Sequence, residues 1–204
     1  MDSRKRILVI SSKRPFPVQD GASIRTSQMI RMLSQIFEVD LVYTCNPYKT
    51  FADLTELRCF CRQISEFLEP KWKCVLRALL GFFKSRPLQC SYFYSPRMMS
   101  YIQEHLSLYD YVFCNNIRTV PYVDGSKCNK IIDYVDAISM NYIGASLKAN
   151  WIWRLVYKFE ANRLISYENK VLKSFDKFII ISDVDRQFIL RHADLEISNK
   201  HIEV

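Results

Sequence analysis

The fold of this chain is decided by residues 7–36, which read ILVISSKRPFPVQDGASIRTSQMIRMLSQI. The apolar run Ile7–Ile10 predicts a short strand that is buried on both faces of a sheet. The loop that follows leads to Gly21, and apolar residues then recur at helical spacing as far as Phe37. A strand, a loop and a helix in this order form the opening unit of a parallel α/β domain.

The loop and the helix start are the first candidate site, because ligands bind beyond the carboxyl ends of parallel strands. Gly21 would let the backbone approach a ligand closely. The helix start near Ala22 offers N–H groups and a positive dipole end to a phosphate or a sugar hydroxyl, and Arg25 would add further donors. The alternative is a tight connection between strand and helix, with Arg25 in solvent.

Further apolar runs predict the other strands of the same sheet, at residues 39–44, 63–69, 110–114, 130–135 and 177–182. Helical spacing and capping residues predict helices over residues 52–62, 71–84, 96–106, 151–175 and 184–191. We therefore expect a mostly parallel sheet of about six strands with helices on both faces.

Composition narrows the class of protein. The chain has 204 residues, 49% of them hydrophobic, and a formal net charge of +8. This charge favours an anionic partner, but the basic residues form no long run, so we do not expect a nucleic acid. The seven Cys and three His show no metal-ligand spacing, which favours free thiols in the cytoplasm and no metal. No apolar stretch has the length of a membrane span.

Residues 71–84 are unusual because aromatic and aliphatic residues crowd one short helix that also carries several Lys and Arg. A basic amphipathic helix with a Trp, here Trp72, can lie in the interface of an anionic membrane, which predicts a peripheral place at the inner face of the membrane. The alternative is a helix packed on the sheet, with its Lys and Arg stems reaching to water.

Polar residues that follow two of the predicted strands are candidates to face a ligand cleft: Asn115 and Asn116 follow one strand, and Ser182 follows the last. Asp133 and Asp136 bracket the end of a further strand. A turn favoured by Asn and a helix cap at Ser182 are the alternatives.

Two carboxylates on the longest predicted helix, Glu160 and Glu168, lie two turns apart on one face. Paired carboxylates suit acid–base chemistry. The favoured interpretation is instead a solvated helix on which they pair with Arg163, Lys158 or Lys170.

Several stretches, taken in order, resemble one family. The segment Ser12–Pro17, followed by Gly21 and Arg25, resembles the opening of family-4 glycosyltransferases. Others resemble a branch of that family often encoded with bacterial exopolysaccharide genes: Ser85–Leu88, Tyr92, Ser95–Arg97, Asp133–Ser139, Glu160, Leu164, Tyr167, Glu168, Ser174–Asp176 and Ile181–Ser182. The resemblance spans nearly the whole chain.

The resemblance implies half of a GT-B enzyme, which has two Rossmann-like domains and transfers a sugar from a nucleotide-sugar donor during polysaccharide biosynthesis, without a metal or other cofactor. In such enzymes the N-terminal domain holds the glycan or lipid-linked acceptor, and its first Gly-containing loop, here at Gly21, reaches the donor phosphates. Where the family often has a His near the reacting sugar, this chain has Asp136. Asp136 is therefore the catalytic candidate, with a turn residue and a hydroxyl-binding carboxylate as alternatives.

The family's donor half supplies a Lys and an Arg for the diphosphate and a Glu for the ribose, and these 204 residues contain no counterpart. We therefore expect residues 1–204 to be a single N-terminal, acceptor-side domain with the C-terminal donor domain absent, and with little activity alone. The competing hypothesis is a non-catalytic α/β module that binds an anionic ligand or a protein partner.

Overall fold

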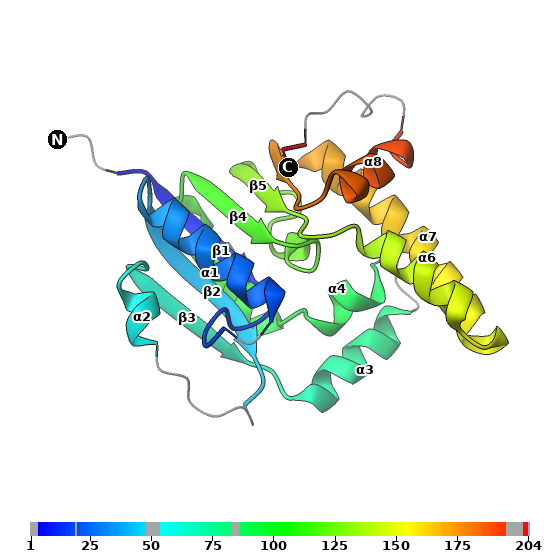
Figure 1. Cartoon of the computed structure of the whole chain (residues 1–204). Helices are drawn as coiled ribbons and strands as arrows, with labels where there is room; N and C mark the ends of the chain where they lie inside the picture. Colours follow the sequence, from blue (N-terminus) through cyan, green and yellow to red (C-terminus); the bar gives the residue numbers. More distant parts are fainter. Residues whose placement is uncertain (1–3, 19, 48–53, 83–85, 195–201, 204) are drawn as a thin grey trace.

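One parallel sheet forms the centre of the computed structural model, which describes residues 4–18, 20–47, 54–82, 86–194 and 202–203 (Figure 1). Its strands are β1 (Arg6–Ser11), β2 (Glu38–Cys45), β3 (Gln63–Leu68), β4 (Tyr111–Asn115), β5 (Asn129–Asp133) and β6 (Lys177–Ile179). They form a 6-stranded sheet in the order β3-β2-β1-β4-β5-β6, and each neighbouring pair is parallel. The predicted sheet is confirmed.

The strand order reverses between β1 and β4. The chain adds β2 and β3 on one side of β1 and then returns to add β4, β5 and β6 on the other. Ile7 of β1 is in register with Val39 of β2 and with Tyr111 of β4. Because all six strands run the same way, their carboxyl ends share one edge, and the reversal at β1 and β4 is where such sheets bind ligands.

Side chains of β1 alternate between two hydrophobic cores, one on each face of the sheet. Ile7 and Val9 pack with Ile30 of α1, whereas Leu8 and Ile10 pack with residues of α4, α5 and α7. The helices are α1 (Gly21–Ser34), α2 (Thr55–Arg58), α3 (Lys71–Gly81), α4 (Leu88–Tyr92), α5 (Pro96–His105), α6 (Ile138–Lys148), α7 (Trp151–Ser174) and α8 (Asp183–Arg191). Helices on both faces are therefore confirmed, with α1 crossing the front of the sheet in Figure 1.

The strand predicted over residues 130–135 ends at Asp133 in the structure. Two further predicted elements are also shorter, each because of how the backbone pairs. The helix predicted over residues 52–62 is α2, a single turn, because the N–H of Arg62 already donates to the Val39 carbonyl of the sheet, at 2.8 Å; residues 52 and 53 lie outside the described part. The strand predicted over residues 177–182 ends at Ile179, because β5 leaves the sheet after Asp133. The helices α4 and α6 were not predicted.

The helix α3 packs by its small residues. Cys74 and Gly81 are its buried residues, while Trp72 and Leu79 are 63% and 64% exposed. A Cβ on Gly81 would lie 2.6 Å from the Cβ of Ser91, so α3 approaches α4 through a glycine contact. The alternative that this segment packs its large apolar face on the sheet is wrong, because that face points to solvent. Residues 83 and 84 of the predicted helix lie outside the described part.

The prediction that Glu160 and Glu168 lie on a solvated face of α7 is also wrong, since both carboxylates are buried. Glu160 pairs with Arg163 at 3.1 Å, as one alternative proposed, and also accepts from the N–H of Leu88. Glu168 accepts from the N–H and hydroxyl of Ser139, at 3.2 and 2.5 Å. These carboxylates therefore fasten α7 to α4 and α6 rather than face water.

The contact at Gly81 yields a stability prediction. Gly81→Ala should lower the free energy of unfolding by about 1–3 kcal/mol, because the new methyl group overlaps the Ser91 side chain. Adding Ser91→Gly should recover part of that loss. The control is Gly144→Ala in α6, where a Cβ meets no atom within 4 Å; it should be neutral or up to about 1 kcal/mol stabilising. Urea titration decides, and equal stability of Gly81→Ala and the parent chain would contradict the packing.

A pH dependence follows from Glu168. Burial, opposed by the two Ser139 hydrogen bonds, raises the pKa of this carboxyl to about 7 from 4.5. Between these values the folded chain holds a proton that the unfolded chain has lost, so this group's contribution to stability falls as pH rises from about 4.5 through about 7. Glu168→Gln should remove a loss of at most about 3 kcal/mol between pH 5 and pH 8.

Denaturation of both chains across this pH range tests the assignment. The control is Glu104→Gln on the exposed side of α5, which should leave the pH profile of the parent chain unchanged. If Glu168→Gln loses stability with rising pH as steeply as the parent, the carboxyl of Glu168 is not the group that titrates.

Candidate functional site

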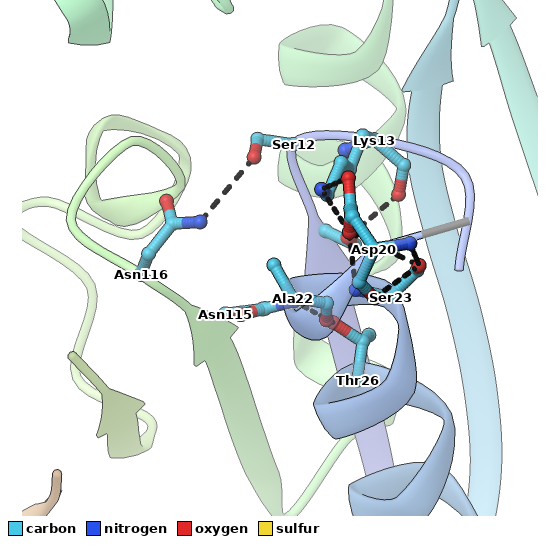
Figure 2. A network of polar contacts seen from close by, with 9 residues as sticks. Ser12, Lys13, Asp20, Ala22, Ser23, Thr26, Asn115 and Asn116 are labelled. Carbon is cyan, nitrogen blue, oxygen red and sulfur yellow. Dashed lines mark hydrogen bonds and ion pairs between the residues drawn. The ribbon is translucent and has the colours of Figure 1, made fainter. Parts of the chain in front are cut away.

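The N-terminus of α1 is a rigid, capped helix start at the carboxyl edge of the sheet. Asp20 is the N-cap, and its carboxylate accepts from the N–H of Ser23 at 2.9 Å. In turn, the N–H of Asp20 donates to the hydroxyl of Ser23. Lys13 pairs with Asp20 at 2.6 Å. The Lys13 hydrogen bond, followed by that of the Ser23 N–H, lowers the pKa of Asp20 to about 2. The loop is therefore fixed to the helix that it introduces (Figure 2).

Gly21 is the first residue of α1, and the space beside it is open. A Cβ built on Gly21 would meet no atom within 4 Å. Packing inside the described chain therefore does not require a glycine at this position. The predicted helix start is confirmed within one residue, and the proposed reason for the glycine, close approach of a ligand, stays a prediction.

Arg25 lies one turn into α1 and reaches across to the end of β5. Its Nε donates to Oδ2 of Asp133 at 2.6 Å, and its Nη2 donates to Oδ1 at 2.9 Å. Asp133 is 1% exposed at its side chain and Arg25 is 22% exposed. The two parallel hydrogen bonds form a fork that also fixes orientation. The alternative of a solvated Arg25 is wrong, and the guanidinium is committed to a buried carboxylate.

Asn115, the last residue of β4, and Asn116, which follows it, connect this edge to α1 and to the loop after β1, as Figure 2 shows. Asn115 is buried and donates through its amide to the hydroxyl of Thr26 in α1. Asn116 adopts φ of 66°, in the left-handed region that Asn tolerates, and its Oδ1 accepts from the Arg118 N–H at 3.0 Å. Its amide also lies 3.4 Å from the Ser12 hydroxyl. The turn predicted as the alternative role is therefore present at Asn116.

Beyond β5 the backbone makes a strained three-residue turn. Val135 has φ of 66°, which is rare for a β-branched residue, and the N–H of Asp136 donates to the Tyr134 carbonyl at 2.7 Å. The Val135 N–H donates to Asp133, the partner of Arg25, at 3.1 Å. Strain of this kind gathers at ligand sites, so the outlier points to this turn as functional.

Asp136 comes out of that turn toward the start of α6. It accepts from the amide of Asn141 at 2.6 Å. Burial raises the pKa of Asp136, against the opposing influence of the Arg118 charge and the Asn141 hydrogen bond. A half-buried carboxyl with a raised pKa is able to hold a hydroxyl group and to exchange its proton.

Arg118 is a site residue that sequence reasoning missed. It lies in the turn after β4, and its Nε donates to Oε1 of Gln89 at 2.7 Å while its guanidinium lies 4.7 Å from the centre of the Phe93 ring. Burial lowers its pKa, and the charge of Asp136 acts in the opposite direction. A basic residue three positions after the strand-ending Asn115 was the available signal. Arg118 brings a positive charge to the carboxyl edge.

Ser182 has a local role in the structure. It is the N-cap of α8, and its hydroxyl accepts from the N–H of Val184 at 3.2 Å. In the same helix Asp185 accepts from the N–H of Ala137, at 3.0 Å. Of the predicted site residues, Arg25 and Asn115 join α1 to the ends of β5 and β4. Gly21, Asn116 and Asp136 lie in the segments next to these contacts, and that they share one ligand site stays a prediction, while Ser182 starts a helix.

In the described ranges, no group of three or more His, Cys, Asp or Glu side chains is placed to hold a metal ion. Within the same ranges, no helix combines the length and the apolar character that crossing a membrane requires.

The fold and the site define a class. An all-parallel sheet in the order β3-β2-β1-β4-β5-β6, with helices on both faces, is a Rossmann-like α/β domain, and its polar groups gather where the strand order reverses. No protein-family model and no curated protein sequence matches the chain.

The ion pair of Arg25 and Asp133 gives a prediction about this site. Arg25→Met leaves a buried carboxylate without its counter-charge and should lower the free energy of unfolding by about 3–5 kcal/mol. Combining Arg25→Met with Asp133→Asn should recover much of the loss. The control is Arg31→Met, whose partner Glu56 is 51% exposed, and it should cost less than about 1 kcal/mol. Thermal and urea unfolding measure all four chains, and equal losses at Arg25 and Arg31 would rule out a buried pair.

Proposed function

We propose that this domain is the acceptor-side half of a glycosyltransferase that moves a sugar from a nucleotide-sugar donor to a glycan or lipid-linked acceptor in polysaccharide biosynthesis. One observation carries the proposal. Two of the segments that resemble family-4 enzymes, around Gly21 and around Asp133, lie more than 100 positions apart and meet through the Arg25–Asp133 fork. Their contact at the reversal point of a Rossmann-like sheet supports a shared site.

Asp136 and Arg118 are the residues we assign to the acceptor. The raised pKa of Asp136 favours a carboxyl that accepts a hydrogen bond, or a proton, from an acceptor hydroxyl. The nearby Arg118 charge favours the ionised carboxylate and would also attract an anionic part of the acceptor. Asn115 and Asn116 support the backbone around them.

The donor phosphates are assigned to the start of α1. The open space at Gly21 leaves room for a group that approaches the helix N-terminus, and the helix dipole favours a negative charge there. The rest of the donor belongs to a second domain of the GT-B type, so the domain alone should hold a nucleotide sugar weakly.

We also propose that the enzyme works at the cytoplasmic face of an anionic membrane, to which α3 binds peripherally. The helix turns its large apolar side chains to solvent and carries the exposed cations Lys71 and Lys73. A non-catalytic binding module for an anionic ligand or a protein partner is the competing function, and the experiment below separates the two.

Calorimetry with a panel of nucleotide sugars tests whether this domain holds the acceptor while a second domain holds most of the donor. The 204-residue chain should show no useful affinity, and adding a donor half from a family-4 enzyme, fused or as a separate chain, should create binding and transfer. Micromolar binding to the chain alone would place the donor site here and overturn the assignment. No transfer with any donor half would favour the binding module.

In the assembled enzyme, Gly21→Val should cut turnover by about tenfold or more while leaving the melting temperature nearly unchanged, because only ligand space is filled. Asp136→Asn should also lower turnover. The control is Gly144→Ala, whose Cβ likewise meets open space but lies in the middle of α6. Unchanged turnover for Gly21→Val would contradict the assignment of this helix start to the donor.

A further inference from the structure

Helix α3 presents one face of large apolar side chains to solvent. They are Trp72, Val75, Leu76, Leu79 and Leu80, each at least 49% exposed. Their spacing of three and four residues places them on one side of the helix. A soluble helix normally buries such a face, so this arrangement needs an apolar surrounding outside the domain.

The tip of the α6–α7 hairpin is a second element of the same kind, and it extends away from the sheet in Figure 1. Its exposed apolar side chains are Leu147, Trp151, Ile152, Trp153 and Leu155, with Trp151 at 72%. Within residues 151–155 only Arg154 is polar. The first turns of α7 are therefore apolar on nearly all sides while exposed, which fits a helix end surrounded by an apolar medium.

The two elements are joined in the structure. The rings of Phe82, next to the end of α3, and Phe159 of α7 lie 5.3 Å apart between their centres. Arg163 donates to the Gly81 carbonyl at 3.0 Å. We call α3 and the hairpin tip together the aromatic–basic surface, and it contains all 3 Trp residues of the chain.

The net positive charge of the chain is also concentrated in the aromatic–basic surface. Residues 71–86 and 148–158 hold 8 of the 29 basic residues and none of the 21 acidic ones, so the remaining 21 basic residues balance the acidic residues and the whole net charge of +8 lies here. Lys71, Lys73, Lys148, Arg154 and Lys158 are exposed, and none of them forms an ion pair with another described residue.

We infer that the aromatic–basic surface is a two-part docking site for an anionic lipid bilayer, in which the tip of the α6–α7 hairpin enters the interface beside α3. The inference extends the membrane association proposed for α3 to a second, independent element. Trp prefers the membrane interface, where its ring is buried and its N–H is hydrated, and each cation near an anionic surface adds to binding. A protein partner fits less well, since Lys is depleted at the centre of protein interfaces.

The geometry also orients the domain. The helix α3 begins directly after the carboxyl end of β3, and α6 begins after the carboxyl end of β5. Both helices of the surface therefore start at the carboxyl edge of the sheet, which is also the edge that holds the candidate site.

Single-Trp variants of the full chain test the hairpin separately from α3. Each variant keeps one of Trp72, Trp151 and Trp153 and carries Phe at the other two positions. Vesicles contain equal amounts of phosphatidylcholine and phosphatidylglycerol, or phosphatidylcholine alone, and brominated acyl chains report contact with lipid. With anionic vesicles at low salt, all three variants should shift their emission to the blue and be quenched, and high salt should weaken both effects.

The inference is overturned if the Trp151 and Trp153 variants do not respond while the Trp72 variant does, an outcome that leaves the association through α3 intact. An equal response to neutral vesicles overturns the anionic preference. A stable dimer in sedimentation, with no response to either vesicle, assigns the surface to a second copy of this chain instead.

Vesicle flotation of two double variants measures how much the exposed Trp side chains contribute to binding. Trp151→Ala with Trp153→Ala should lower the partition coefficient by about tenfold or more, because two large exposed rings lose their apolar burial. Met32→Ala with Ile36→Ala is the control, since these side chains near the end of α1 are equally exposed, at 60% and 68%, and lie outside the surface. Equal partitioning of both double variants contradicts the inference, and thermal unfolding confirms that each chain is folded.

Discussion

Burial of β1 on both faces is the constraint on which the rest of the structure depends. Ile7, Leu8, Val9 and Ile10 have no exposed surface, so both faces of the sheet must be covered by helices. Helical crossovers between strands make the neighbours of β1 parallel, and parallel strands end at one edge. The position of the candidate site is therefore a consequence of how four apolar residues are buried.

At the carboxyl edge of the sheet, an ion pair and a strained turn fix the loops that follow the strands. The Arg25–Asp133 fork links the first helix to the end of β5, and the same carboxylate accepts from Val135 in the strained turn before Asp136. Asn116 holds the adjacent turn and Arg118 extends from it. Groups from α1, from the turn after β4 and from the end of β5 are thus held by hydrogen bonds at one edge of the sheet, and a site for a polar ligand requires such preorganisation.

The domain exposes large apolar side chains and buries charged ones, which reverses the usual distribution. The three Trp side chains are exposed, while Glu160 and Glu168 are buried and accept hydrogen bonds from Leu88 of α4 and Ser139 of α6. Glu160 also pairs with Arg163 of its own helix. Buried carboxylates of this kind fix how helices pack but contribute little net stability. The exposed Trp side chains all lie in the aromatic–basic surface.

The sequence by itself determined the periodic elements of this protein, because helix and strand periods are local properties. The strand at Ile7–Ile10, the helix after Gly21 and the Ser95 cap, whose hydroxyl accepts from the Met98 N–H at 3.3 Å, could all be predicted. The ordered motifs also predicted which loops carry a site, and this stays a prediction.

Only the tertiary structure decided what each face and each charge contacts. A helical period states that α3 and α7 have apolar faces, but the direction of those faces depends on neighbours distant in the chain, such as Ser91 beside Gly81 and Ser139 beside Glu168. The burial of Asp133 and its pairing with Arg25 likewise depend on the sheet order, which brings residues more than 100 positions apart to the same edge. The whole fold determines how distant segments pack, so a local sequence pattern cannot predict these contacts.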